Sequence, residues 1–297
     1  MFGGRVRLVW SAALVASLTL AACGGGGGNK SGGGLTDLGK KLPKAVQDAG
    51  TIRVGSDIEY APVEFFKENT KIAQGLDVDV ANALGTKLGV KFRFIDDTDF
   101  AGIILALRSG RFDIVMSAMN DTAERRGKGV DFIDYFRAGS SILVQKGNPR
   151  KVTGLDDLCG ATVAVQQGTI QDTDILGAQD GKCRAAGRPL AVLRFEKDTD
   201  ALQQVKNGRA VADLEDFPVA AYNAQTSGAG KDFDVVAGQV GDVASYGVAV
   251  PSSNPSLRDA LQGALKAVIA DGTYDKVLAG WNVSAGALTT AAIDGGS

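Results

Sequence analysis

The chain is organised around one stretch, Ala118-Met119-Asn120-Asp121-Thr122-Ala123-Glu124-Arg125, at the centre of residues 112–147. An apolar run with strand character, Ile114-Val115-Met116, stops shortly before it. Thr122 then stands where a helix N-cap would, with Arg125 in the first turn. A strand that ends at a helix start presents free backbone N–H groups and the positive end of the helix dipole, so it favours an anion. Arg125 adds a planar fork of donors suited to a carboxylate. The alternative is an ordinary capped surface helix with a solvated arginine.

Three segments in this region together form a recognisable motif: Gly110-Arg111-Phe112-Asp113-Ile114, Met119-Asn120-Asp121-Thr122-Ala123-Glu124-Arg125 and Val130-Asp131-Phe132-Ile133-Asp134-Tyr135-Phe136. They resemble the central signature of bacterial extracellular solute-binding proteins, in the class that serves ATP-driven importers of polar amino acids. The resemblance covers about residues 51–281. In that class the arginine of the Thr-x-Glu-Arg turn holds the α-carboxylate of the ligand. The matching residue is Arg125, not Arg126.

The resemblance implies an α/β fold of the two-lobed periplasmic-binding-protein type (type II), with two strands crossing between the lobes. Lobe 1 is expected at residues 51–143 and 246–283, and lobe 2 at residues 144–245. Strand and helix patterns alternate along the chain, which favours the same parallel-rich architecture. A length of 297 residues also exceeds what one small core needs. Residues 284–297 are small and polar, so we expect a disordered tail there.

The composition excludes several kinds of function. Hydrophobic residues make up 44% and charged residues 22% of the chain, as in soluble globular proteins. The net charge of −2 gives no reason to expect a nucleic-acid partner. The chain has no histidine, which removes Ser-His-Asp and Cys-His nucleophile pairs and every histidine-ligated metal site. We expect no cofactor and no metal.

The N-terminus has the features of a targeting segment. Arg5 and Arg7 precede an apolar run at 8–22, which is short for a membrane-spanning helix and typical of a signal peptide. The run ends in Leu20-Ala21-Ala22-Cys23, which resembles the bacterial lipoprotein box, where the cysteine is diacylated and becomes the new N-terminus. The alternative is a plain secretory signal with an incidental cysteine. We therefore expect a signal peptide at 1–22, then lipidated Cys23 and a flexible Gly-rich tether to residue 50, with the protein outside the cytoplasm and lipid-anchored to the cell membrane.

The chain has three cysteines. If Cys23 carries lipid, Cys159 and Cys183 are left as a pair. An extracytoplasmic location permits a disulfide between them. The alternative is two free thiols.

In lobe 1 the expected ligand residues follow from the resemblance. Asp57 and Tyr60 match positions that face the ligand in the family. Otherwise Asp57 is a turn residue and Tyr60 a core aromatic. Phe100 matches an aromatic residue that packs on the ligand side chain. Ala118 and Asn120 belong to the stretch quoted first.

In lobe 2 a turn, Gln166-Gln167-Gly168-Thr169-Ile170, joins a strand to a helix start. In the family the threonine of this turn contacts the ligand carboxylate. The alternative is a simple connecting turn. Asp216 matches the aspartate of the family's Asp-x-Pro-Val-Ala segment, which takes the ligand's ammonium, and it also suits a helix N-cap. The full expected ligand set is Asp57, Tyr60, Phe100, Ala118, Asn120, Arg125, Gln166, Thr169, Ile170 and Asp216.

The implied function is capture of a free polar amino acid outside the cytoplasm and its delivery to an ABC-type permease, without enzymatic activity. Asp57, Glu59 and Glu215 lie in or next to the ligand loops, so we expect a basic or amide-bearing ligand side chain rather than glutamate or aspartate. Two alternatives remain open. Some proteins with this fold are dehydratases, since acidic side chains can act as general acid and base. The second alternative is a ligand-sensing protein that serves a membrane kinase.

Overall fold

The computed structural model describes residues 35–296, and its fold is α/β as predicted. One sheet runs through both lobes in the order β5-β1-β6-β12-β7-β10-β8-β9, and β11 pairs with β7. Its strands are β1 (Thr51–Gly55), β5 (Lys91–Ile95), β6 (Ile114–Val115), β7 (Val130–Gln145), β8 (Thr162–Gln166), β9 (Ala191–Phe195), β10 (Ala212–Asp216), β11 (Phe233–Val235) and β12 (Val240–Pro251). A small antiparallel sheet holds β2 (Glu59–Tyr60), β3 (Glu64–Phe66) and β4 (Ala73–Gln74).

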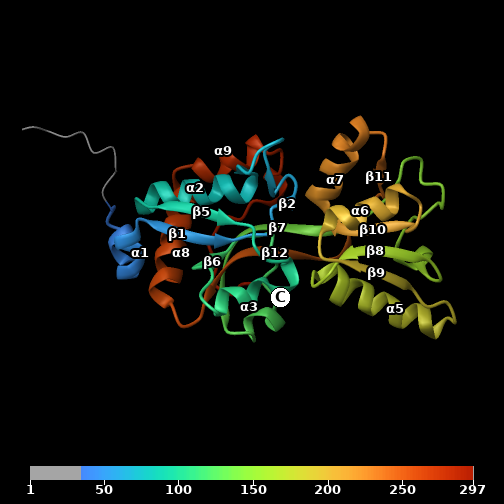
Figure 1. The fold of residues 1–297 in the computed structure, drawn as a ribbon, viewed down its shortest axis with the longest axis horizontal. Helices are drawn as coiled ribbons and strands as arrows, with labels where there is room; N and C mark the ends of the chain where they lie inside the picture. Colours follow the sequence, from blue (N-terminus) through green and yellow to red (C-terminus); the bar gives the residue numbers. More distant parts are fainter. Residues whose placement is uncertain (1–34, 297) are drawn as a thin grey trace, which may run out of the picture. The chain divides into compact units, whose positions relative to one another are not determined.

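Helices cover both faces of the large sheet (Figure 1). They are α1 (Lys44–Ala49), α2 (Leu76–Leu88), α3 (Ile103–Arg108), α4 (Ala123–Arg126), α5 (Leu176–Ala185), α6 (Asp198–Lys206), α7 (Phe217–Thr226), α8 (Pro255–Ala270) and α9 (Thr273–Gly280). Short 3-10 turns lie at Gly39–Lys41, Phe100–Gly102, Leu155–Leu158, Ser227–Ala229 and Ser284–Gly286, and a π-helical turn at Gln171–Ile175 precedes α5.

Strand β7 shows how each lobe buries both faces of the sheet. Successive residues of a strand point to opposite faces. In lobe 1, Ile133 belongs to the core that includes residues of α2 and α8, whereas Phe132 belongs to the core under α3. In lobe 2, Ile142 packs with residues of α5, and Leu143 packs with residues of α6 and α7. Two-sided burial is what a parallel-rich sheet requires.

Strands β7 and β12 connect the lobes. Residues 130–140 of β7 pair with β12, and residues 140–144 pair with β10 on the opposite edge. The two predicted crossing strands are therefore present, and β7 extends far into lobe 1. Asp131, Asp134 and Arg137 interrupt the apolar pattern of its first half, which hides the strand in the sequence.

The C-terminal segment differs from the expected disordered tail. Ile293 forms a β-bridge with Ile133. The side chain of Asp294 accepts a hydrogen bond of 2.7 Å from the backbone N–H of Phe132. Ala291 is buried in the core of lobe 1. Residues 291–294 thus pack on lobe 1, although the sequence of this segment has no helical or strand period.

The structure tests only part of what we predicted for the N-terminal segment. Residues 1–22 and Cys23 lie outside the described residues. The tether was expected to reach residue 50, but Leu42 and Val46 pack in the core of lobe 1, so residues 39–49 belong to the fold. Within residues 35–296, no helix is both long and apolar enough to cross a membrane. Cys159 and Cys183 are joined by a disulfide with a Cα–Cα distance of 5.1 Å, as predicted.

Candidate functional site

Among the cavities that lie between residues of lobe 1 and residues of lobe 2, two have Phe100 in their walls. The narrow cavity holds about 10 Å³, roughly the space of one water molecule. Its walls are Asp57, Tyr60, Glu64, Phe100, Ser117, Ala118, Asn120, Gln166, Thr169, Gln171 and Asp216. This set contains every expected ligand residue except Arg125 and Ile170. The structure therefore brings together residues from five separate parts of the chain.

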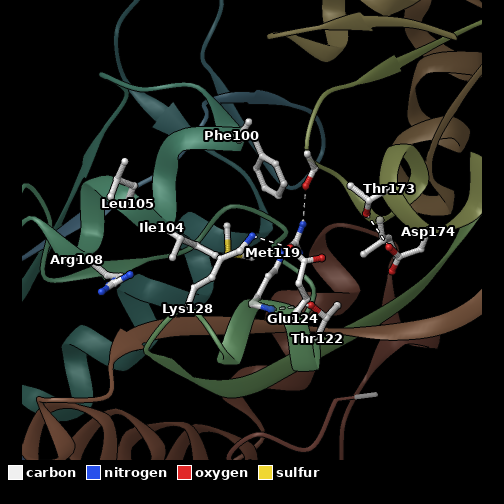
Figure 2. A pocket seen from close by; sticks show the side chains of 14 residues that line it. Phe100, Ile104, Leu105, Arg108, Met119, Thr122, Glu124, Lys128, Thr173 and Asp174 are labelled. Atoms are coloured by element: carbon white, nitrogen blue, oxygen red, sulfur yellow. Dashed lines mark hydrogen bonds and ion pairs between the residues drawn. The ribbon is translucent and has the colours of Figure 1, made fainter. Parts of the chain in front are cut away.

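The wide cavity holds about 330 Å³ and includes Arg125, Ile170, Arg108 and Lys128 in its walls. In Figure 2 the side chains of Thr173 and Asp174, from lobe 2, lie across this cavity from Leu105 of lobe 1. The two expected residues that are missing from the narrow cavity, Arg125 and Ile170, thus line the wide cavity, which shares Phe100 with the narrow one.

Arg125 is buried at the end of the predicted anion-binding turn. The Thr122 side chain caps α4 by accepting a hydrogen bond of 3.3 Å from the backbone N–H of Arg125. The guanidinium donates to two backbone carbonyl oxygens, of Asn120 at 2.9 Å and of Gly168 at 3.0 Å. It also lies 5.2 Å from the centre of the Phe100 ring. These partners are all neutral.

Among the described residues, the carboxylates that act on the charge of Arg125, Asp216 foremost, do so without forming an ion pair with it. The side chain is 6% exposed, and no ion pair within residues 35–296 includes it. Burial lowers its pKa to about 10, so it stays charged at neutral pH. A buried charge without an ion-pair partner is costly, so Arg125 is suited to receive a carboxylate.

Asp216 is the matching negative group at the end of β10. The Tyr60 hydroxyl accepts a hydrogen bond of 2.8 Å from the backbone N–H of Asp216 and donates one of 3.3 Å to its carboxylate. Gln171 donates to the other carboxylate oxygen at 2.9 Å. Burial raises the pKa of Asp216 to about 6, against hydrogen bonds that favour the charged form. Among the described residues it forms no ion pair, so it is suited to receive a ligand ammonium.

Asp57 is held by lobe 2 in this conformation. Its carboxylate pairs with Lys197 and accepts a hydrogen bond of 2.7 Å from the side-chain amide of Gln166. Its backbone N–H donates to the hydroxyl of Ser117 at 3.0 Å. Burial raises its pKa, although Lys197 counters this. A ligand that reaches Asp57 has to replace or adjust these contacts between the lobes.

Asp77 lies behind the cavity wall and supports the backbone of Ala118. Asp77 accepts a hydrogen bond of 3.2 Å from the backbone N–H of Ala118 and another from the Tyr135 hydroxyl. Ala118 has a φ of 46°, which costs a non-glycine residue about 1–3 kcal/mol and needs such support. Burial raises the pKa of Asp77 to about 7. Asp77 therefore fixes the shape of the cavity rather than facing it.

The turn after β8 contacts lobe 1 through Gly168. Its φ is +80°, and a Cβ atom added there would lie 3.0 Å from the Cβ of Ala101. Glycine is thus required for this close approach. The Thr169 hydroxyl donates to the carbonyl of Gln166 at 2.9 Å and accepts from the backbone N–H of Asp172 at 3.2 Å. In this conformation Thr169 stabilises the turn, and its hydroxyl is engaged within lobe 2.

Sequence reasoning missed three residues of the narrow cavity, Glu64, Ser117 and Gln171. Glu64 is 1% exposed, accepts a hydrogen bond of 2.9 Å from Ser117, and has its pKa raised well above the ordinary range by burial. Glu64 follows Tyr60 by four positions, and Ser117 directly precedes Ala118, so proximity in sequence was the available signal. Glu215, expected to add charge near the ligand, does not line either cavity.

The comparison with known families settles the identity of the fold. The profile of the bacterial extracellular solute-binding proteins, family 3, matches residues 52–284. The chain belongs to this family. The prediction made from the signature segments is confirmed, and so is the two-lobed fold.

Individual family members are similar over most of the chain. The arginine-binding protein ArgT of Corynebacterium glutamicum is 29% identical over 290 residues, which cover 95% of this chain and 93% of ArgT. An ancestral arginine-binding protein, solved bound to arginine, has 39% identity and a TM-score of 0.69, covering 78% of this chain and 98% of its own. The ancestral amino-acid-binding protein AncCDT-1, described as a precursor of cyclohexadienyl dehydratase, has 38% identity and a TM-score of 0.69, covering 80% of this chain and 97% of its own.

Proposed function

We propose that this solute-binding protein captures a free amino acid with a basic or amide-bearing side chain between its lobes, and delivers it to the permease of an ATP-driven importer. The observation that carries the proposal is the pair of buried, opposite charges, Arg125 and Asp216, neither of which forms an ion pair among the described residues. A free amino acid has one carboxylate and one ammonium, and it matches both. The relatives that bind arginine support the same ligand class.

The charges around the cavity favour a ligand side chain that donates hydrogen bonds. Asp57, Glu64 and Asp216 contribute carboxyl groups to the walls of the narrow cavity, while Arg125 lies in the wall beside it. The α-ammonium uses Asp216, so Asp57 remains for the side chain of the ligand. Phe100 and Tyr60 offer aromatic faces that suit a guanidinium. A glutamate side chain would instead add an anion next to Asp57, which is unfavourable.

Calorimetric titration with arginine, lysine, histidine, glutamine and glutamate tests the ligand class. We expect binding of at least one of the first four and none of glutamate. Tight binding of glutamate contradicts the proposal.

The second candidate is an enzyme of the dehydratase type, favoured by the similarity to AncCDT-1. Glu64 is buried at the cavity with a raised pKa, which suits a general acid. Incubation with arginine and with a cyclohexadienyl acid, followed by product analysis, separates the two functions. Turnover of either compound contradicts a pure binding role.

For the location, we propose that Cys23 carries lipid and tethers the protein to the outer side of the cell membrane. The sequence Leu20-Ala21-Ala22-Cys23 supports this. The variant Cys23→Ser should be released from the membrane fraction in detergent-free buffer and should still bind its ligand. A variant that remains membrane-bound contradicts the lipid anchor.

A further inference from the structure

Three carboxyl groups lie together inside lobe 2, outside the walls of both ligand cavities. Asp198 begins α6, and Asp213 and Glu215 stand on the same face of β10 because they are two positions apart. One oxygen from each carboxyl group lies within 4.8 Å of the other two. The three residues are 2%, 0% and 1% exposed, so water does not surround them.

The cluster has acceptor atoms that the protein does not satisfy. Among residues 35–296, neither carboxyl oxygen of Asp213 has a hydrogen-bond partner, and Oε1 of Glu215 has none. The other oxygen of Glu215 accepts a hydrogen bond of 2.9 Å from the amide of Asn223. A carboxyl proton shared between Asp198 and Glu215 satisfies part of this cluster. Unsatisfied buried carboxyl oxygens such as those of Asp213 are rare and call for a further partner.

Ser141 is an independent sign that something binds there. It is paired directly with Glu215 across the β7–β10 ladder, so both side chains lie on the same face of the sheet and close together. Ser141 is fully buried, and its hydroxyl also has no hydrogen-bond partner in the described part of the chain. A neutral oxygen without a partner therefore lies beside Glu215 on the face of the sheet that carries the cluster.

No positive side chain balances this cluster. The ion pairs within the described residues do not include Asp198, Asp213 or Glu215. Lys197, next to Asp198 in sequence, pairs with Asp57 and Asp96 of lobe 1 instead. Burial, together with the neighbouring acids, raises the pKa of Asp198 to about 8 and those of Asp213 and Glu215 well above the ordinary range. Such a site must hold protons or a cation.

We propose that Asp198, Asp213 and Glu215 bind a calcium ion, with the hydroxyl of Ser141 as a further ligand. The donor set consists of oxygen atoms only, which suits a hard cation and not zinc. Calcium binds oxygen at about 2.3–2.6 Å, so three oxygen atoms that lie within 4.8 Å of one another are close enough to share one ion. Magnesium usually keeps several waters, which a buried pocket of carboxylates does not favour.

The calcium site would support the part of lobe 2 that meets lobe 1. The backbone N–H of Asp198 donates a hydrogen bond of 2.7 Å to the carboxylate of Glu59, and the Thr199 hydroxyl donates one of 2.5 Å to its other oxygen. Lys197 pairs with Asp57 at the narrow cavity. An ion that fixes the first turn of α6 therefore holds three contacts between the lobes in place.

The test measures the metal content and the thermal stability of the full chain. Protein is treated with chelator, dialysed against calcium or magnesium, freed of unbound metal, and analysed by inductively coupled plasma mass spectrometry. We expect about one calcium ion per chain, and a Tm several degrees higher with calcium than with chelator. Asp213→Asn and Glu215→Gln keep the shape of the side chains, and each should lose both the bound calcium and the calcium-dependent rise in Tm.

Two further variants separate ion binding from a general effect of charge or folding. Asp200→Asn removes an exposed carboxylate from the same helix and should behave as the wild type. Ser141→Ala removes only the hydroxyl and should weaken calcium affinity several-fold, a readout that remains if an acidic variant fails to fold. Absence of bound calcium in the wild type, calcium binding that persists in both acidic variants, or stabilisation by magnesium alone would each overturn the proposal.

Discussion

The guanidinium of Arg125, in lobe 1, donates a hydrogen bond of 3.0 Å to the carbonyl oxygen of Gly168, in lobe 2. The residue to which we assign the ligand carboxylate thus also joins the two lobes. A carboxylate bound to Arg125 would lie between the lobes, so ligand binding and lobe closure are expected to be coupled. Hinged closure around a ligand is a common mode of switching.

The first prediction concerns Arg125. Removing one partner of a buried charge pair costs about 3–5 kcal/mol, so Arg125→Ala should weaken amino-acid binding by at least about 100-fold. Isothermal titration calorimetry measures this. Arg126→Lys is the control, because Arg126 pairs with Asp121 and does not line either cavity. Near-wild-type affinity in Arg125→Ala contradicts the assigned role.

The second prediction concerns pH. Burial raises the pKa of Asp216 to about 6, and only its charged form attracts an ammonium. Affinity should therefore be constant above about pH 7 and should fall as the pH drops through about 6. In Asp216→Asn the affinity should be low at every pH. A wild-type affinity that does not change down to about pH 5 shows that Asp216 does not bind the ammonium.

The third prediction separates lobe closure from backbone strain. Gly168→Ala places a methyl group 3.0 Å from Ala101 of the other lobe, and it also forces alanine to a φ of +80°. Gly187→Ala forces a similar φ of +72° with nothing within 4 Å. Both variants should lose about 1–2 kcal/mol of stability, but only Gly168→Ala should lose ligand affinity, by about tenfold or more. Small-angle scattering with saturating ligand should show closure in Gly187→Ala and the wild type. Equal affinities in the two variants would falsify the role of Gly168.

The fourth prediction concerns the disulfide. The bond between Cys159 and Cys183 closes a loop across 24 positions. Replacing both cysteines by serine should lower the free energy of unfolding by about 3 kcal/mol on the chain-entropy estimate. Urea unfolding measures this, and reduction of the wild type should give a similar loss. The prediction is wrong if both leave the unfolding midpoint unchanged.

The fold and most residues of the candidate site could be predicted because their signals are local. Thr122 caps the helix that carries Arg125, and Asp216 ends a strand and begins a helix, as the sequence indicated. These features depend on residues only a few positions apart. The two cysteines also needed no more than an assignment of the compartment.

The remaining features depend on contacts that no local pattern encodes. Lys197 and Asp57 are 140 positions apart, and their ion pair forms only when the lobes meet. Asp213 and Glu215 alternate with apolar residues like any strand with one polar face, and their burial appears only when α6 covers that face. The C-terminal segment was expected to be disordered because small residues carry no period, yet Asp294 binds the backbone of Phe132.

The most direct measurement of the central claim is a calorimetric titration of the full chain with L-arginine and with L-glutamate under the same conditions. The account predicts one site per chain for arginine with a Kd in the micromolar range or lower, and no measurable heat of binding for glutamate. Binding of glutamate at the same site would contradict it. The account would also be contradicted if neither arginine nor any other basic or amide-bearing amino acid bound.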